Sequence, residues 1–196
     1  PLVIRTVTGG GAQLGATHSQ SLEGWFASVP GLKVAVPSDP YDALGLLRTA
    51  ITDDDPVIFV EHALLYNATG EVPENSYNVE FGEAKVKRSG KDVTIVAYSR
   101  MVPVSLDAAE ILSVRGIEVE VVDLRTLRPI DFDTVVDSVK KTGRVVVVEE
   151  AWKLGGFAGE IASGIQERAF DYLDGPIGRV CGVDVPTPYS HKLESA

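Results

Sequence analysis

Residues 119–133 read Val119-Glu120-Val121-Val122-Asp123-Leu124-Arg125-Thr126-Leu127-Arg128-Pro129-Ile130-Asp131-Phe132-Asp133. The run Val119–Val122 is rich in valine and favours a buried β-strand. Asp131 is a typical N-cap residue, and the apolar residues after it recur on one helical face, at Phe132, Val135, Val136 and Val139. A strand followed by a capped amphipathic helix is the repeating unit of α/β proteins, so this stretch predicts that class.

The same alternation continues on both sides of residues 119–133. Strands are expected at 92–98, 145–148 and 177–181, and helices at 102–114 and 157–170. Val145–Val148 is a run of four valines, which is typical of a strand in the middle of a parallel sheet. Strand–helix–strand units of this kind predict parallel strands joined by right-handed crossovers.

The first 60 residues carry a second alternating series. Strands are expected at 2–6, 32–36 and 56–60, and the first of them reads as a buried strand. A glycine-rich loop covers residues 8–15, and a short helix is expected at 19–27. Asp39 caps a longer helix that starts at Pro40. This series predicts another parallel sheet with helical crossovers.

Residues 63–90 interrupt the alternation, because they contain several Gly, Pro and Asn residues and show no long periodicity. Such a composition predicts a connection that contains one short strand. We therefore expect an α/β protein with two parallel-sheet units. Residues 1–66 form the first unit, residues 67–90 the connecting segment and residues 91–196 the second unit.

The composition excludes several classes of protein. The chain of 196 residues is 44% hydrophobic and 23% charged, which is the balance of a globular protein. Its formal net charge of −10 argues against nucleic acid as a partner and favours a basic protein surface. The single cysteine, Cys181, lies in the apparently buried strand Arg179–Gly182, so we interpret it as a core residue. One cysteine cannot form an intrachain disulfide, which favours a reducing compartment.

The sequence has neither an apolar run long enough to cross a membrane nor a secretory signal pattern. We therefore expect no membrane and no secretory route. The chain opens on Pro1–Arg5, which reads as a strand already in progress, and this suggests a fragment.

Four features could carry chemistry. His18 could transfer protons near neutral pH, although a histidine bonded to the loop backbone is the simpler interpretation. Asp53-Asp54-Asp55 is either a solvated acidic turn or a cation site that uses the free carbonyl groups at a helix end. The loop Gly9–Gly15 lacks the dinucleotide and P-loop spacings, which favours a tight turn over a phosphate site. Glu149-Glu150 and Asp123 end strands at the sheet edge where α/β proteins bind ligands.

Short motifs throughout the chain resemble one family. They are Thr17-His18-Ser19-Gln20, Pro30-Gly31-Leu32-Lys33-Val34, Ser99-Arg100, the stretch 119–133 and Asp184-Val185-Pro186-Thr187-Pro188-Tyr189. Together they resemble the β chain of thiamine-diphosphate-dependent 2-oxo acid dehydrogenases, truncated at both ends. The resemblance implies the C-terminal part of a pyrimidine-binding-type domain in residues 1–66 and a transketolase C-terminal-like domain in residues 91–196.

The resemblance implies an activity and partners. Enzymes of this family oxidatively decarboxylate a 2-oxo acid and transfer the acyl group to lipoyl groups of an acyltransferase core. They are α2β2 heterotetramers that share thiamine diphosphate and magnesium between the α and β subunits. The β-chain glutamate that activates the cofactor lies upstream of the matched region, so the 196 residues alone are expected to be inactive. The segments Glu61–Asn67 and Asp184–Tyr189 look closest to the pyruvate enzymes, and the branched-chain and acetoin enzymes are similar.

The resemblance also implies roles for individual residues, whereas it assigns no certain cofactor-binding residue to this segment. His18 matches the family's active-site histidine, which orients substrate or moves a proton. A structural potassium site built mainly from backbone carbonyls matches five residues, namely Leu2, Ala50, Ile51, Asp53 and Asp55. Asp174 matches an acidic contact for the basic peripheral binding domain of the acyltransferase, and Asp171 extends the same patch.

Two other classes remain open. A transketolase or deoxyxylulose-phosphate-synthase type of enzyme also carries a strand like Val122–Arg125, and it would be a single long chain. A non-catalytic docking or assembly module would bind the acyltransferase without an α chain. The expected compartment is the bacterial cytoplasm or an organelle matrix or stroma.

Overall fold

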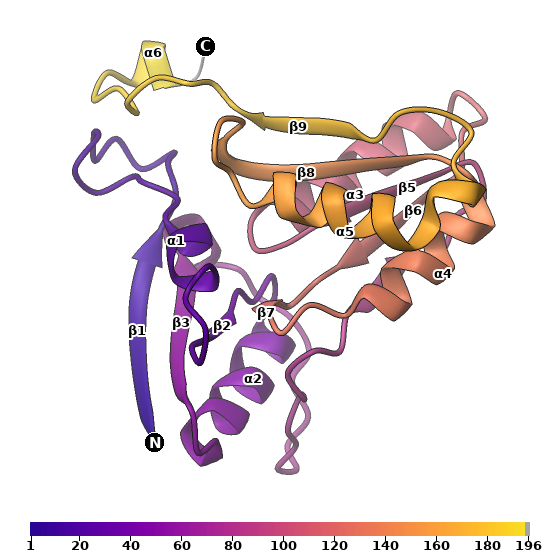
Figure 1. The fold of residues 1–196 in the computed structure, drawn as a ribbon. Helices are drawn as coiled ribbons and strands as arrows, with labels where there is room; N and C mark the ends of the chain where they lie inside the picture. Colours follow the sequence, from indigo (N-terminus) through magenta and orange to yellow (C-terminus); the bar gives the residue numbers. More distant parts are fainter. Residues whose placement is uncertain (195–196) are drawn as a thin grey trace.

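The computed structural model describes residues 1–194 and contains two mostly parallel sheets (Figure 1). The first sheet has the strand order β1-β3-β2-β7. Strands β1 (Leu2–Thr8), β3 (Pro56–His62) and β2 (Lys33–Ala35) are parallel, and β7 (Thr126–Arg128) is antiparallel to β2. Helices α1 (Glu23–Ala27) and α2 (Pro40–Thr52) belong to this half of the molecule. The two-sheet α/β class expected from the sequence is confirmed.

The second sheet has the strand order β4-β6-β5-β8-β9. Only β4 (Lys85–Arg88) is antiparallel, because it enters the sheet directly from the connecting segment. The parallel strands are β5 (Val93–Ala97), β6 (Val119–Asp123), β8 (Val145–Trp152) and β9 (Gly178–Gly182). The crossover helices are α3 (Met101–Ser113), α4 (Phe132–Thr142) and α5 (Ala158–Ala169).

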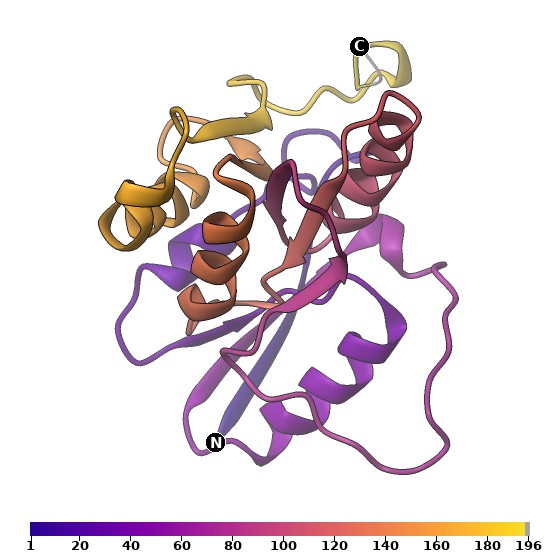
Figure 2. The ribbon, with the colours of Figure 1, turned by 90° about the vertical axis from the view of Figure 1, so that its right-hand side faces the viewer.

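Helices cover both faces of the second sheet (Figure 2). Ile95 and Val121 pack with the buried residues of α3 on one face. Their sequence neighbours Val96 and Val122 point to the other face, where they meet α4 and α5. This two-sided burial follows from the alternation of side chains along a strand, and it explains why these strands are apolar throughout.

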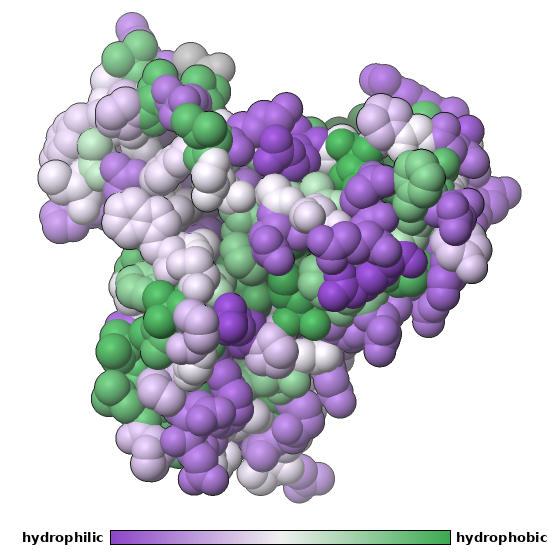
Figure 3. All heavy atoms as spheres, in the orientation of Figure 1, coloured by the Kyte–Doolittle hydropathy of each residue, from purple (hydrophilic) through white to green (hydrophobic). Residues whose placement is uncertain are grey.

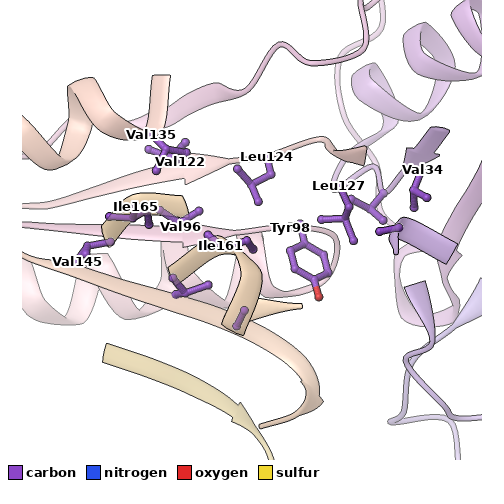
Figure 4. Packing of buried hydrophobic residues seen from close by; sticks show 14 of the residues in the cluster. Val34, Val96, Tyr98, Val122, Leu124, Leu127, Val135, Val145, Ile161 and Ile165 are labelled. Atoms are coloured by element: carbon purple, nitrogen blue, oxygen red, sulfur yellow. The ribbon is translucent and has the colours of Figure 1, made fainter. Parts of the chain in front are cut away.

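The largest core cluster joins the two halves of the molecule (Figure 4). Val34 and Ile58 of the first sheet pack in the same cluster as Val96, Tyr98 and Leu127. The opposite face of the first sheet packs on α2, which contributes Leu46 and Ala50 to a separate cluster. The first sheet therefore uses the second unit as one of its two covering layers.

Three short elements complete the described chain. They are the 3₁₀ helices η1 (Ala63–Leu65) and η2 (Phe170–Tyr172), and the single turn α6 (His191–Glu194). The predicted caps are present, because Asp39 accepts the backbone N–H of Asp42 and Asp131 accepts that of Thr134. Within residues 1–194, no helix combines the length and the apolar character that a membrane crossing requires.

Four sequence-based expectations differ from the structure. The strand at 2–6 is not buried, because β1 is an edge strand and Leu2, Ile4 and Val7 are largely exposed. Apolar surface is visible on this side of the molecule (Figure 3). The strand around Cys181 is also an edge strand, so this cysteine is only half-buried. The helix expected at 19–27 is limited to α1, and the carbonyl of Gln20, before the helix, accepts the hydroxyl of Thr8. The short strand β7 was not predicted.

Candidate functional site

The two sheets meet where β1 and β3 of the first sheet and β8 of the second sheet end. The glycine-rich loop of residues 9–15, the end of β8 and the C-terminal segment of residues 183–194 come together there (Figure 1). They enclose a cavity of about 250 Å³. Its polar lining includes Ser19, Glu150 and Glu194. Carboxyl ends of parallel strands are the usual location of ligand sites in α/β proteins, so the edge predicted from Glu149-Glu150 is the candidate site.

The amide groups of the glycine-rich loop bind two carboxylates. Gly10 donates to Oε1 of Glu150 over 2.8 Å. Gly11 and Gln13 donate to Oε1 and Oε2 of Glu194 over 2.7 Å and 3.0 Å. Gly9 has a φ of +91°, and a Cβ atom at this position would overlap the His62 ring. The loop needs its glycine here for close packing, and its amides bind carboxylates of the same chain.

His18 follows this loop and is exposed. Its backbone N–H donates to the carbonyl of Gly15 over 3.3 Å, which closes a turn immediately after the glycine-rich loop. The His18 side chain is not among the residues that line the cavity, whereas that of its neighbour Ser19 is. The role of His18 stays a prediction.

His62 and Glu150 form a pair that the sequence did not reveal. Nε2 of His62 lies 2.6 Å from Oε2 of Glu150, and Nδ1 accepts the N–H of Leu64 over 3.1 Å. Because Nδ1 is an acceptor, the neutral ring carries its proton on Nε2 and donates it to Glu150. The two residues are 88 positions apart, so only the packing of the two units brings them together.

A buried group of acids lies behind the cavity. Burial raises the pKa of Glu23 to about 7, although the hydroxyl of Thr8 donates to its carboxylate. Burial also raises the pKa of Glu149, whose Oε2 accepts hydrogen bonds from the Tyr98 hydroxyl over 3.0 Å and from the Ala158 amide over 2.9 Å. These neutral or hydrogen-bonded carboxyls can remain in the junction at a tolerable cost.

A network of ion pairs links the two units on the other side of the junction. Asp42 of α2 is fully buried and lies 2.7 Å from Lys87 and 2.6 Å from Arg125. Lys87 also lies 2.7 Å from Asp39 and 3.6 Å from Asp123. Burial raises the pKa of Asp123 to about 6, although Lys87 and the hydroxyl of Ser38 oppose that shift. Asp123 is therefore part of a structural ion network.

The acidic turn at the end of α2 binds a lysine. Nζ of Lys33 lies 2.6 Å from Asp53 and 3.2 Å from Asp55. Burial acts to raise the pKa of Asp53, but the hydrogen bonds from Lys33 outweigh it and hold that pKa below its ordinary value. Leu2 lies beside this turn, because it pairs in register with Pro56. Lys33 thus pairs with two of the three carboxylates of this turn.

Asp171 and Asp174 lie on the opposite end of the second unit. Both are exposed, Asp171 in η2 and Asp174 just after it. Asp174 faces Arg144 at 3.8 Å, and its backbone N–H donates to the carbonyl of Gly143. The two carboxylates are near each other in sequence and remote from His18, so they form a separate surface feature.

Within residues 1–194, no group of three or more His, Cys, Asp or Glu side chains is arranged to hold a metal ion. The network around Lys87, the His62–Glu150 pair and Glu194 are the polar features that sequence reasoning missed. Their members come from distant segments. His62 and Asp123 could be suspected from their positions at the ends of β3 and β6, whereas Lys87, inside β4, and Glu194, in α6, gave no such signal.

Comparisons with known proteins match both units. The family model described as "Transketolase, pyrimidine binding domain" matches residues 1–69, and the model described as "Transketolase, C-terminal domain" matches residues 82–196. The chain is 50% identical over 200 residues to the pyruvate dehydrogenase E1 component subunit beta, mitochondrial, of Dictyostelium discoideum, covering 100% of this chain and 56% of that protein. It is 51% identical over 194 residues to the acetoin:2,6-dichlorophenolindophenol oxidoreductase subunit beta of Cupriavidus necator, covering 99% and 57%.

A solved structure is also similar. It is described as a split gene transketolase, inactive beta4 tetramer, and it superposes with a TM-score of 0.78 at 30% identity. The alignment covers 93% of this chain and 58% of that chain. The 196 residues thus span a little over half the length of the proteins that they match.

Proposed function

Because the chain belongs to the transketolase family, with a pyrimidine-binding and a C-terminal domain, we propose that its natural protein is the β subunit of a thiamine-diphosphate-dependent 2-oxo acid dehydrogenase. The observation that carries this proposal is the 50% identity to a pyruvate dehydrogenase β subunit along the whole chain. The proposed reaction is oxidative decarboxylation of pyruvate, with transfer of the acetyl group to a lipoyl group.

The residues of this chain do not fit the diphosphate end of the cofactor. The loop amides that could bind phosphate are engaged by Glu150 and Glu194, and residues 1–194 offer no acidic cluster for magnesium. We therefore assign the diphosphate and magnesium to an α subunit in an α2β2 assembly. Thiamine supplies the electron sink for decarboxylation, and this chain supplies an exposed histidine.

In this proposal His18 orients the 2-oxo acid or moves a proton during decarboxylation and acyl transfer. Its exposure, next to Ser19 in the cavity lining, supports that role, since an imidazole must reach the reacting group to act. Replacing His18 with Asn in the full-length protein, assembled with its α subunit, should lower the rate of acetyl transfer by about 10²–10⁴-fold while thiamine binding is retained.

His191 is the matched control, because it is also exposed and lies outside the catalytic proposal. His191→Asn should leave turnover unchanged. Turnover by His18→Asn at the wild-type rate would contradict the catalytic proposal.

The potassium site is the second part of the proposal. The last turn of α2 leaves the carbonyl groups of Ala50 and Ile51 without helical partners, and Leu2, Asp53 and Asp55 lie at the same end of the sheet. Potassium chloride should therefore raise the thermal stability of the assembled enzyme more than sodium chloride does at equal ionic strength. Equal stabilisation by the two salts would contradict the site.

The exposed acids Asp174 and Asp171 support a docking role in the same proposal. A basic binding domain of the acyltransferase core would meet these carboxylates, and the net charge of −10 favours a basic partner. Asp174→Asn should weaken binding of the acyltransferase and reduce its dependence on salt. Asp107→Asn, an exposed acid on α3, is the control and should leave binding unchanged.

Acetoin oxidation is the alternative substrate assignment, because the Cupriavidus necator relative is as similar as the pyruvate dehydrogenase subunit. Parallel assays of the assembled enzyme with pyruvate, a branched-chain 2-oxo acid and acetoin decide between these substrates. We expect the bacterial cytoplasm or an organelle matrix or stroma as the compartment, and the Dictyostelium discoideum relative is named mitochondrial.

A further inference from the structure

The loop of residues 9–15 is held from two sides by the second unit. On one side Glu150, at the end of β8, accepts the N–H of Gly10 over 2.8 Å. On the other side Glu194, in α6, accepts the N–H groups of Gly11 and Gln13 over 2.7 Å and 3.0 Å. The loop contributes three backbone donors, and the second unit contributes two carboxylates.

The backbone conformation of the loop creates these donors. Gly9, Gly11 and Gln13 have φ angles of +91°, +91° and +57°, so left-handed residues alternate along the loop. The loop presents the N–H groups of Gly10, Gly11 and Gln13 to carboxylates, as backbone nests do for anions. A non-glycine residue such as Gln13 adopts this conformation at a cost, which the charged hydrogen bond to Glu194 offsets.

Each carboxylate is itself held in place. His62 donates to Glu150 over 2.6 Å, so Glu150 cannot turn away without breaking its hydrogen bond to a buried histidine. The C-terminal segment that carries Glu194 lies along the glycine-rich loop (Figure 1). Thr187 of that segment donates to the carbonyl of Ser19 over 3.4 Å, and the Tyr189 ring packs against Gly15.

We propose that Glu150 and Glu194 are positioning residues that set the place of His18 by binding the amides of the loop before it. This inference rests on the proposed role of His18. The two carboxylates do not touch the substrate in this scheme, and they act through the four residues that separate Gln13 from His18. A shift of the loop by about 1 Å would move the imidazole away from the reacting group.

The test uses the full-length protein assembled with its α subunit, and it compares Glu194→Gln and Glu150→Gln with Glu167→Gln. A carboxamide has one acceptor oxygen and turns an NH₂ group toward the second donor, so each variant loses a hydrogen bond and gains a repulsive contact. Glu167 is exposed on α5 and remote from the loop, so its variant makes the same chemical change without effect there.

Hydrogen–deuterium exchange of the peptide that contains residues 9–18 is the first readout. Exchange in Glu194→Gln should be about tenfold faster than in wild type, because a hydrogen bond to a charged acceptor is lost. Acetyl transfer should fall by about tenfold, and thiamine binding should not change. In a His18→Asn background, Glu194→Gln should cause no further loss of turnover, since both changes act on the same group.

Each result has one meaning. If exchange in both Gln variants equals that in Glu167→Gln, Glu150 and Glu194 do not hold the loop, and the proposal is wrong. Faster exchange with unchanged turnover, or an additional loss in the His18→Asn background, would overturn the positioning role and leave a structural contact. If His18→Asn itself is fully active, the proposed catalytic role of His18 fails. The exchange result still tests whether Glu150 and Glu194 hold the loop. Should Glu150→Gln fail to fold, Glu194→Gln carries the test alone, because α6 is a single surface turn.

Discussion

The two sheets of this molecule are built from the same strand–helix alternation, yet they reach stability in different ways. The second sheet has helices of its own unit on both faces, and its central strands β5 and β6 are almost completely buried. The first sheet has α2 on one face and the second unit on the other. Its outer strand β1 is largely exposed, and its opposite edge is closed by β7, which comes from far along the chain.

This difference teaches that the first sheet depends on the second unit. The dependence is carried by the shared core, by β7 and by the ion network around Asp42. Perturbations of these three features should therefore destabilise the whole chain, whereas changes on the outer edge of the first sheet should have small effects.

The largest effect is expected from Asp42→Ala. This change removes the carboxylate that pairs with Arg125, whereas Lys87 keeps Asp39 and Asp123. An uncompensated buried charge costs about 3–5 kcal/mol. Urea denaturation of the purified chain measures the loss. Asp107→Asn removes an exposed carboxylate and should change the free energy of unfolding by less than ~0.5 kcal/mol. Equal behaviour of the two variants would show that the network does not join the units.

Leu127→Ala tests the contribution of β7. Leu127 is 1% exposed and packs in the core shared by both units, so its truncation should cost about 2–5 kcal/mol. Leu154→Ala is the matched control, because Leu154 is 76% exposed and should cost under ~0.5 kcal/mol. A small loss in the free energy of unfolding for Leu127→Ala would mean that the first sheet does not depend on β7.

The buried acid Glu23 should make the junction sensitive to pH. Burial raises its folded pKa to about 7 from an ordinary value of 4.5, so the folded state holds a proton that the unfolded state releases. Protonated Glu23 contributes its full amount to the free energy of unfolding below pH 4.5. This contribution is lost as the pH rises through 7, which lowers the free energy of unfolding by up to about 3 kcal/mol. The raised pKa of Asp123, about 6, adds to the same trend between pH 4 and 6.

Denaturation at pH 5 and pH 8 measures this loss, and Glu23→Gln should flatten the profile above pH 6 because the amide does not titrate. A wild-type chain that is more stable at pH 8 than at pH 5 would contradict the assignment of a protonated Glu23.

The smallest effect compares two isoleucines that are register partners. Ile4 on β1 and Ile58 on β3 lie side by side, but Ile4 is 46% exposed and Ile58 is 4% exposed. Ile58→Val should cost about 0.5–1.5 kcal/mol, and Ile4→Val should cost less than ~0.5 kcal/mol. Similar costs would show that the edge of the first sheet is as tightly packed as its centre.

The site was only partly predictable. The ends of β3 and β8 were recognisable from apolar runs followed by Glu61-His62 and Glu149-Glu150. The contact between His62 and Glu150 was not, because it joins residues 88 positions apart through the packing of two units. The role of His18 and the potassium and docking residues came from resemblance to a family, and they remain proposals that the experiments above can test.

Local sequence determined the strands, the helices and their caps, because side-chain periodicity and capping act over fewer than about five residues. It predicted the cap at Asp39, the buried strand β6 and the position of β8 inside a parallel sheet. Tertiary structure alone decided that β1 and β9 lie at edges, that β7 joins the first sheet, and that Glu150 and Glu194 meet the loop before His18. Exposure and long-range hydrogen bonding depend on which surfaces face each other, and no local pattern contains that information.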